Sequence, residues 1–496
     1  MQLCGTTALF FEYHRFILKI NWQRHATLDF CDCLYLKYKT LIMKVFKSIL
    51  VLFALSFFSC ELDDGEIVPS PDPNSGLWYN AEKGYILNIK DEKTDLINIT
   101  NGGCAYYVPN FKPEDFGYRL EQKDSTILLR PSFSSIADIV FTAEETDEFC
   151  DVLSMEPNND PMVNYNYFWN FFNDHYAFFE LRSINWEEFS GFEDIVTEAN
   201  FYDTLAAIVY QFEDGHITIT DEANGIEINA GAPKLFTRLN ANLSVDNKAA
   251  NEEELVALIH LKLELIQQKY LSNGFKSSAT TNMVYGMIND QIGYLNILEM
   301  DGFGTDINNE IAAVGKEMTA ALTYLKSLGM SKLIIDTRFN TGGIDQVSVE
   351  IASRFTTEQR VGFTKKARLI EGFTPVKTVN FGPKGDEQFT GEIVLLTSPI
   401  TASAAEVFAL CLKDMPNVTL VGEATNGVFS DILEHRLPNG ATIGLSNEVY
   451  ADSKGVVFEG VGIAPLQEEF LVPLLTDDDI QRQVDSGILK TIAILE

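Results

Sequence analysis

Along residues 285–470 the hydrophobic positions follow two repeat lengths in turn, one typical of buried strands and one typical of helices. The runs IGYLNIL (292–298) and KLIIDTR (332–338) have the length and apolar content of buried strands. The segments NNEIAAVGKEMTAALTYLKSLG (308–329) and DQVSVEIASRF (345–355) have helical spacing instead. This alternation predicts βαβ units around a mainly parallel sheet, with functional sites at the carboxyl ends of its strands.

The pattern changes upstream and downstream of this core. Residues 77–148 alternate in short runs broken by Gly, Asn and Asp, which predicts a small antiparallel β domain. Residues 149–284 are interpreted as a helical cap and connecting segment, with the aromatic-rich stretch NYNYFWNFFNDHYAFF (164–179) and an amphipathic helix at 252–271. Residues 471–496 are expected to form a C-terminal helix and tail. The fold class expected is therefore α/β.

The first part of the chain has the features of an export signal. MKVFKSILVLFALSFFSC (43–60) has a lysine-bearing start, an apolar core and a small residue before a cysteine. It resembles a bacterial lipoprotein signal with Cys60 as the lipidated residue, which implies an outer-membrane lipoprotein of the cell envelope. Residues 1–42 are interpreted as an upstream over-extension, and 61–76 as an acidic, proline-containing tether. An uncleaved anchor is the alternative, but the apolar core is shorter than a membrane span.

Net charge, motifs and cysteine content argue against several classes of partner and cofactor. The chain has 37 Lys and Arg against 71 Asp and Glu, so nucleic acid is a poor partner. It contains no CxxC, HExxH, P-loop or GxGxxG motif, and we expect no cofactor, metal ion or nucleotide. Cys104 and Cys150 could pair in an oxidising compartment, although nothing in the sequence fixes the pairing. Cys411 is interpreted as core packing.

One serine stands at a chemically suggestive position. In TSPITASAAEVFALCLKD (397–414), Ser403 lies between an apolar run of strand length and a helical pattern. Free backbone N–H groups and the helix dipole at such a turn favour a developing negative charge, as an acyl-transfer serine requires. The alternative is that Ser403 only caps the helix, with Glu406 completing a capping box. The local sequence leaves both interpretations open.

Three further motifs lie near predicted strand ends. DTRFNTGG (336–343) ends in two glycines, which permit backbone conformations that turn N–H groups toward a ligand. EDGHITI (213–219) places His216 at a helix-to-strand corner, and VVFEGVGIAP places Glu459 before a glycine turn. Each motif alone is compatible with an ordinary turn, an exposed histidine or a surface glutamate.

Taken together and in order, these motifs resemble the S41 serine peptidases, the group of C-terminal-processing and tricorn-core proteases. The resemblance covers roughly residues 77–470 and is similar in its first half to a Bacteroidetes-type lipoprotein branch. It implies a ClpP/crotonase-like α/β core and a polypeptide substrate. It also implies Ser403 as the nucleophile, with an oxyanion hole made by the N–H of Ala404 and a glycine N–H from Gly342 or Gly343.

The sequence departs from the processing branch at the proton acceptor. That branch has a lysine after its GE-x-T-x-G motif, where this chain has Val428, which cannot accept a proton. The tricorn-core branch resembles a Ser–His–Glu arrangement instead, and His216, Ser403 and Glu459 occur in that family's chain order. A neutral imidazole can deprotonate the serine while a carboxylate fixes its tautomer. Glu448 is the rival for the third position.

The functional expectation is an exported, lipid-anchored serine peptidase. A catalytically inactive peptide-binding lipoprotein of the same fold, or an esterase with the same triad, are the alternatives. Residues 220–285 show no clear GLG-type loop of the kind with which the processing branch binds substrate C-termini, so a more open peptide cleft is expected.

Overall fold

The computed structural model describes residues 75–90, 93–123, 125–131, 138–144, 157–271 and 274–496. The signal segment with Cys60 and nearly all of the tether lie outside these residues, so the predictions about them remain predictions. Cys104 is disulfide-bonded. Cys150, the partner considered for it, also lies outside the described residues.

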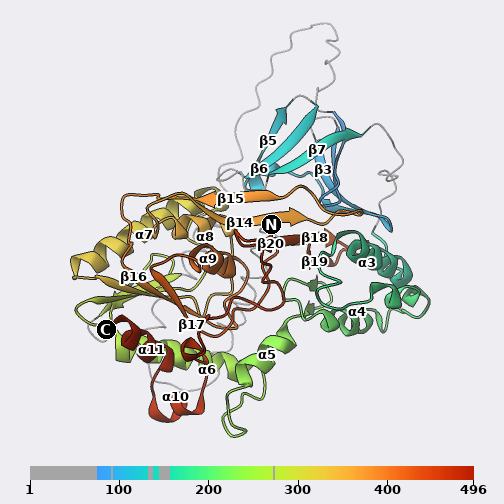
Figure 1. The fold of residues 1–496 in the computed structure, drawn as a ribbon. Coiled ribbons are helices and arrows are strands. Elements are labelled where there is room, and N and C mark those ends of the chain that lie inside the picture. Colours follow the sequence, from blue (N-terminus) through green and yellow to red (C-terminus); the bar gives the residue numbers. More distant parts are fainter. Residues whose placement is uncertain (1–74, 91–92, 124, 132–137, 145–156, 272–273) are drawn as a thin grey trace, which may run out of the picture. The chain divides into compact units, whose positions relative to one another are not determined.

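An antiparallel sheet of seven strands forms the first part of the described chain, in the order β4-β3-β2-β1-β7-β6-β5 (Figure 1). Leu87, Ile127 and Phe141 on its strands are fully buried, in a core shared with the aromatic segment. The predicted antiparallel β region is confirmed. Its strands are β1 (Gly76–Asn80), β2 (Tyr85–Lys90), β3 (Lys93–Thr100), β4 (Gly103–Val108), β5 (Tyr118–Lys123), β6 (Thr126–Pro131) and β7 (Ile139–Glu144).

The aromatic-rich stretch forms most of α3 (Pro161–His175), and α4 (Phe201–Val209) follows it, so the predicted helical region is present. Asp160 caps α3 by accepting the N–H of Met162. The helices pack on a four-stranded sheet in the order β18-β19-β8-β9. The region predicted as a helical cap therefore also contains a hairpin, which pairs with a strand from much later in the chain. These strands are β8 (Thr218–Asp221), β9 (Ile226–Asn229), β18 (Ile432–Arg436) and β19 (Thr442–Ser446).

The core sheet has six strands in the order β10-β11-β12-β13-β16-β17, and β12, β13, β16 and β17 run parallel to one another. The predicted strands and the parallel arrangement are present. The sheet begins before residue 285, because the antiparallel strands β10 and β11 precede the parallel ones. Its strands are β10 (Phe275–Ser277), β11 (Met283–Met287), β12 (Ile292–Ile297), β13 (Lys332–Asp336), β16 (Glu392–Thr397) and β17 (Val418–Gly422).

Helices cover both faces of the core sheet (Figure 1). Successive side chains of β13 point to opposite faces: Leu333 and Ile335 pack toward α7, α8 and α9, and Ile334 toward α5, α6 and α11. This double burial explains why the strands are continuously apolar. The helices are α5 (Ala232–Asn240), α6 (Glu252–Leu265), α7 (Glu310–Ser327), α8 (Asp345–Ala352), α9 (Ala404–Leu412), α10 (Asp477–Arg482) and α11 (Ser486–Leu495).

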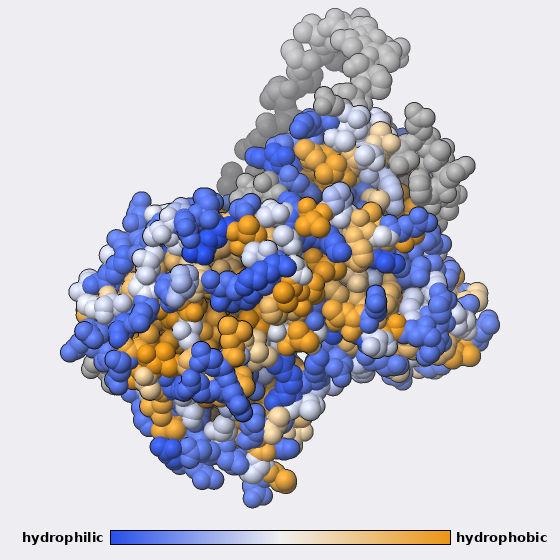
Figure 2. Space-filling model, viewed as in Figure 1, coloured by the Kyte–Doolittle hydropathy of each residue, from blue (hydrophilic) through white to orange (hydrophobic). Residues whose placement is uncertain are grey.

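A fourth sheet, of three strands in the order β15-β14-β20, lies beside α9 and is antiparallel. Its strands are β14 (Arg360–Ala367), β15 (Lys377–Phe381) and β20 (Glu448–Ala451). Polar and apolar residues are interspersed over the face of the molecule seen in Figure 2. Among the described helices, none combines the length and hydropathy needed to cross a membrane.

Candidate active site

Ser403 lies at the turn between β16 and α9, as the sequence predicted. It is the N-cap residue of α9 and has φ 53° and ψ −124°, a backbone conformation that costs energy for a residue with a side chain. The residues that follow it in α9 are buried, whereas Ser403 is half-buried. A strained strand-to-helix turn that keeps one serine accessible is typical of a nucleophile position.

Glu406 fixes this turn to a neighbouring loop. Its carboxylate accepts the N–H groups of Ser403 (3.2 Å), Gly427 (2.7 Å) and Val428 (2.8 Å). In return, the carbonyl of Val428 accepts the N–H of Ser403 at 3.1 Å. Burial raises the pKa of Glu406 to about 7, although the N–H donors oppose this rise. Glu406 therefore does cap the helix. The same contacts hold Ser403 in place, so helix capping and a role as nucleophile are compatible.

Of the two glycines of the NTGG motif, Gly342 lies against the serine, and Gly343 lies against the backbone of Met300. A methyl group on Gly342 would lie 2.7 Å from Cβ of Ser403 and 3.2 Å from the nitrogen of Ala404. The N–H of Gly342 is already bonded to the side chain of Asn340 at 2.8 Å. Among the described residues, neither the N–H of Gly343 nor that of Ala404 has an acceptor. These two N–H groups are the better candidates for an oxyanion hole, and Gly342 supplies space.

His216 lies next to the Val428 loop, which is bonded to Ser403, but no hydrogen bond joins its ring to the serine among the described residues. It lies just before β8, and its backbone N–H donates to Asp214 at 3.0 Å. A side chain on Gly215 would be 3.5 Å from a methyl of Val428, the residue whose carbonyl is bonded to Ser403. The histidine corner thus lies next to the position at which the resemblance expects a lysine.

The imidazole of His216 is buried and chemically uncommitted. The residue is 4% exposed, and neither ring nitrogen has a hydrogen-bond partner among the described residues. Burial lowers its pKa below the ordinary value, although the carboxylates of Asp214 and Asp431 oppose this shift. The ring is therefore neutral near pH 7, which is the form that can accept a proton.

Glu459, the predicted third member, is buried at the same corner but makes other contacts. One carboxylate oxygen accepts Nη2 of Arg182 at 2.6 Å, and the other accepts the N–H of Phe429 at 2.8 Å. The structure brings Glu459 to the loop that holds Ser403, yet no hydrogen bond joins it to His216 among the described residues.

Arg182 links two carboxylates that the sequence did not connect. Its guanidinium lies 2.6 Å from Glu459 and 3.5 Å from Asp214, and the latter also accepts the hydroxyl of Tyr176 at 2.9 Å. Burial alone would raise the pKa of Asp214, but Arg182 holds it below its ordinary value. Burial and the charge of Asp214 raise the pKa of Glu459. The sequence analysis did not predict a role for Arg182. The available signal was a basic residue just after the aromatic-rich stretch.

Glu448, the other candidate for the third position of the triad, makes its contacts with Lys365 and Ser430. It is buried and accepts Nζ of Lys365 at 2.8 Å, and its backbone N–H donates to the hydroxyl of Ser430 at 2.8 Å. Like Glu459, it makes no hydrogen bond with the His216 ring among the described residues.

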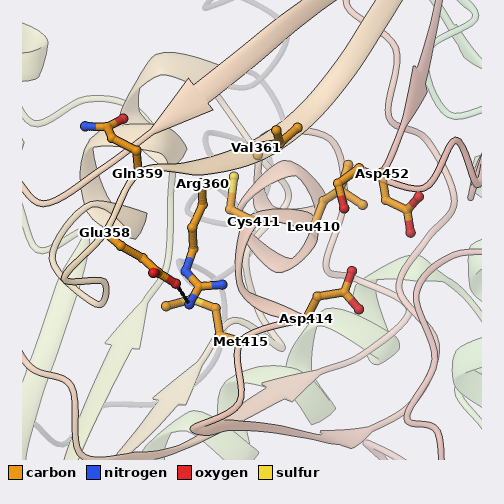
Figure 3. Close-up of a pocket in the computed structure, with 11 residues that line it drawn as sticks. Glu358, Gln359, Arg360, Val361, Leu410, Cys411, Asp414, Met415 and Asp452 are labelled. Carbon is orange, nitrogen blue, oxygen red and sulfur yellow. Dashed lines mark hydrogen bonds and ion pairs between the residues drawn. The ribbon is translucent and has the colours of Figure 1, made fainter.

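A cavity of about 340 Å³ lies at the other end of α9 (Figure 3). Cys411, Asp414, Asp452 and Arg360 are among its lining residues. Burial raises the pKa of the Cys411 thiol well above its ordinary value, so the thiol stays protonated and is a poor nucleophile. Cys411 in its lining is about two turns of helix from Ser403, and the cavity takes no part in the site. Within the described ranges, no cluster of three His, Cys, Asp or Glu side chains could hold a metal ion.

Comparisons with known proteins place the core among proteases. Residues 291–468 match the family model described as peptidase family S41. Carboxy-terminal processing protease CtpA of Bacillus subtilis is 24% identical over 324 residues, which cover 63% of this chain and 68% of that protein. The carboxyl-terminal-processing protease of Picosynechococcus is 25% identical over 198 residues, or 38% of this chain and 43% of the relative. The chain thus spans less than half the length of this cyanobacterial relative.

A solved structure of a Parabacteroides merdae protein has the same fold. It aligns with a TM-score of 0.55 and 22% identity, over 68% of this chain and 97% of that one. The similarity confirms the α/β protease fold that the sequence predicted.

Proposed function

We propose that this chain, whose residues 291–468 match the model of peptidase family S41, hydrolyses peptide bonds with Ser403 as nucleophile and His216 as general base. The observation that carries the proposal is the strained, half-buried Ser403 at the N-terminus of α9, with the backbone of Gly342 packed against it. The relatives named as carboxyl-terminal-processing proteases support a polypeptide substrate for this chain.

In the proposed reaction, His216 removes the hydroxyl proton as Oγ of Ser403 attacks the scissile carbonyl carbon. The negative charge that develops on the carbonyl oxygen is stabilised by the N–H groups of Ala404 and Gly343. The imidazolium then gives its proton to the leaving amine, and an acyl-enzyme remains. Water, deprotonated by the same histidine, hydrolyses this ester and restores the serine.

Glu459, the third member of the proposed triad, acts indirectly, through Arg182 and the loop that holds Ser403. Glu459 holds Arg182 and the Phe429 N–H, and so positions both the histidine corner and the loop bonded to Ser403. We assign it a positioning role in the Ser–His–Glu set, in preference to Glu448.

Labelling with a fluorophosphonate probe tests the activated serine without knowledge of the substrate. The full chain should label, and Ser403→Ala should lose labelling together with turnover of an unstructured protein such as casein. Ser430→Ala is the matched control, since its hydroxyl only bridges backbone groups near the site. Labelling without casein turnover, but with turnover of aryl esters, would favour an esterase. No labelling of the folded chain would favour a peptide-binding protein without catalysis.

We further propose that Cys60 carries lipid and attaches the protein to the outer membrane of a bacterial cell envelope. The apolar run before a small residue and cysteine supports this proposal. Mass spectrometry of the mature N-terminus should find an acylated Cys60. Peptides from residues 1–42 in the mature protein would contradict it.

A further inference from the structure

Asp431 is a half-exposed carboxylate near His216 that no step of the proposed reaction uses. It lies three residues after Val428, in the loop that holds Ser403, and directly precedes β18. Its side chain is 42% exposed, and its ion pair with Lys83 measures 3.9 Å, the longest of the ion pairs among the described residues. The carboxylate is therefore weakly held and free to respond to a charge that appears nearby.

The sheet β18-β19-β8-β9 places Asp431 and His216 at the same end of their strands. Ile432, the first residue of β18, pairs with Ser446 on β19. β19 pairs in turn with β8, in a register that, extended by two residues, sets His216 opposite Ser446. The hydroxyl of Ser446 donates at 3.1 Å to Asp214, which also accepts the N–H of His216. Because neighbouring strands lie about 4.8 Å apart, the start of β18 is about 10 Å from the histidine corner.

The other charges around His216 largely cancel. Asp214 and Glu459 share the guanidinium of Arg182, at 3.5 Å and 2.6 Å. Burial and the charge of Asp214 raise the pKa of Glu459 to about 8, so these three groups together carry little net charge near pH 7. Burial lowers the pKa of His216, and the carboxylates that oppose this shift are Asp214 and Asp431, whereas Arg182 adds to it. Asp431 is thus the negative charge near the imidazole that no cation of the histidine corner balances.

The groups around Asp431 leave its charge available to the histidine. Lys365 is bonded to Glu448 at 2.8 Å, and among the described residues only Lys83 makes an ion pair with Asp431 itself. A long, half-exposed ion pair is worth little in free energy, because water screens it. The charged and titratable side chains that act on Asp431 are Lys83, Lys365, Asp345, Glu434, Tyr85 and Tyr450.

We propose that Asp431 is a further positioning residue of the peptidase: its carboxylate stabilises the positive charge that His216 gains when it takes the proton of Ser403. The proposal rests on the peptidase function given above. Stabilisation of the imidazolium is one of the two tasks of a triad carboxylate, and orientation of the ring is the other. In this chain the tasks are divided: Glu459, bonded to Arg182, holds the geometry of the corner, and Asp431 supplies the charge.

The pH dependence of full-length variants separates a charge effect from a structural one. Asp431→Asn should lower kcat about threefold, because the imidazolium of the transition state loses a stabilising charge. The acid limb of kcat/KM should move to lower pH by about 0.5, since the loss of the negative charge lowers the pKa of His216 further. Asp431→Glu keeps the charge and should restore both values. Asp414→Asn is the matched control, because Asp414 is 43% exposed and paired with Lys454 beyond the other end of α9, and it should change neither value.

A histidine titration followed by NMR gives a readout that needs no turnover. In the full-length chain with isotopically labelled histidine, the His216 signal is the one that His216→Ala removes, and its midpoint should fall by about 0.5 in Asp431→Asn. An unchanged midpoint, or a loss of kcat that Asp431→Glu does not restore, would overturn the role of Asp431. A lower midpoint in a chain with neither probe labelling nor peptide turnover would contradict the peptidase and leave the charge effect of Asp431 in place.

Discussion

Two buried histidines in this protein lie in very different surroundings. His435 on β18 has both ring nitrogens in hydrogen bonds, one with the hydroxyl of Tyr167 (3.1 Å) and one with the carbonyl of Lys83 (2.7 Å). It also stacks on Phe171 with the ring centroids 4.2 Å apart. His216 is buried to a similar degree, yet neither of its ring nitrogens has a partner among the described residues.

The difference shows what burial means for each ring. Burial lowers the pKa of both histidines, so both rings are neutral near pH 7. At His435 the protein satisfies the ring, and the free energy of those contacts goes into stability. At His216 the lack of partners is a cost to stability, since buried polar atoms are normally bonded. An unsatisfied ring next to the loop that holds Ser403 is explained if its hydrogen bond forms only when substrate is bound.

The largest effect should come from replacing each histidine in turn. His216→Ala should lower turnover on the order of ten-thousandfold or more, because the serine loses its base. His435→Ala should instead lower the free energy of unfolding by about 3 kcal/mol, through a cavity and lost hydrogen bonds. Turnover per folded molecule and denaturant unfolding measure the two effects.

The half-exposed His260 on α6 is the control for this comparison and should change neither quantity. Retained probe labelling in His216→Ala would mean that another residue activates Ser403. A loss of turnover in His435→Ala that exceeds the unfolded fraction would remove the contrast between the two histidines.

A smaller loss is expected at Gly342. A methyl group there would lie 2.7 Å from Cβ of Ser403, and the residue has φ 117°. Gly342→Ala should therefore displace the nucleophile or the oxyanion donors and lower kcat about a hundredfold to a thousandfold. Gly440→Ala is matched in backbone strain, with φ 96°, but its methyl would meet no heavy atom within 4 Å. It should leave kcat unchanged, and equal losses in both variants would show that only strain matters.

The sequence predicted most of the fold because its strands and helices carry strong local signals. β13 is continuously apolar since both of its faces are covered, and α7 has helical spacing ending near Gly329, which has φ 95°. The position of Ser403 followed from the same strand-to-helix pattern. The contacts of Glu459 did not, because its partner Arg182 is 277 residues away and carries no periodic signal. The strand after His216 was predicted, but its sheet was not, since β8 pairs with β19 more than 200 residues later.

The smallest of these effects should come from the third member of the proposed triad. Glu459→Gln can still accept the Phe429 N–H, but it loses the ion pair with Arg182 and should lower kcat about tenfold to a hundredfold. A glutamine side chain has the shape and neutral charge of a protonated glutamate. Burial, together with the charge of Asp214, raises the pKa of Glu459. The carboxyl of the wild-type protein ionises as pH rises, so its advantage over Glu459→Gln should grow with pH. Glu448→Gln is the control, because Glu448 pairs with Lys365, makes no hydrogen bond with the His216 ring and should leave kcat nearly unchanged. A Glu459→Gln loss above a thousandfold would indicate direct contact with the imidazole in the working enzyme, and a crippled Glu448→Gln would transfer the role to that residue.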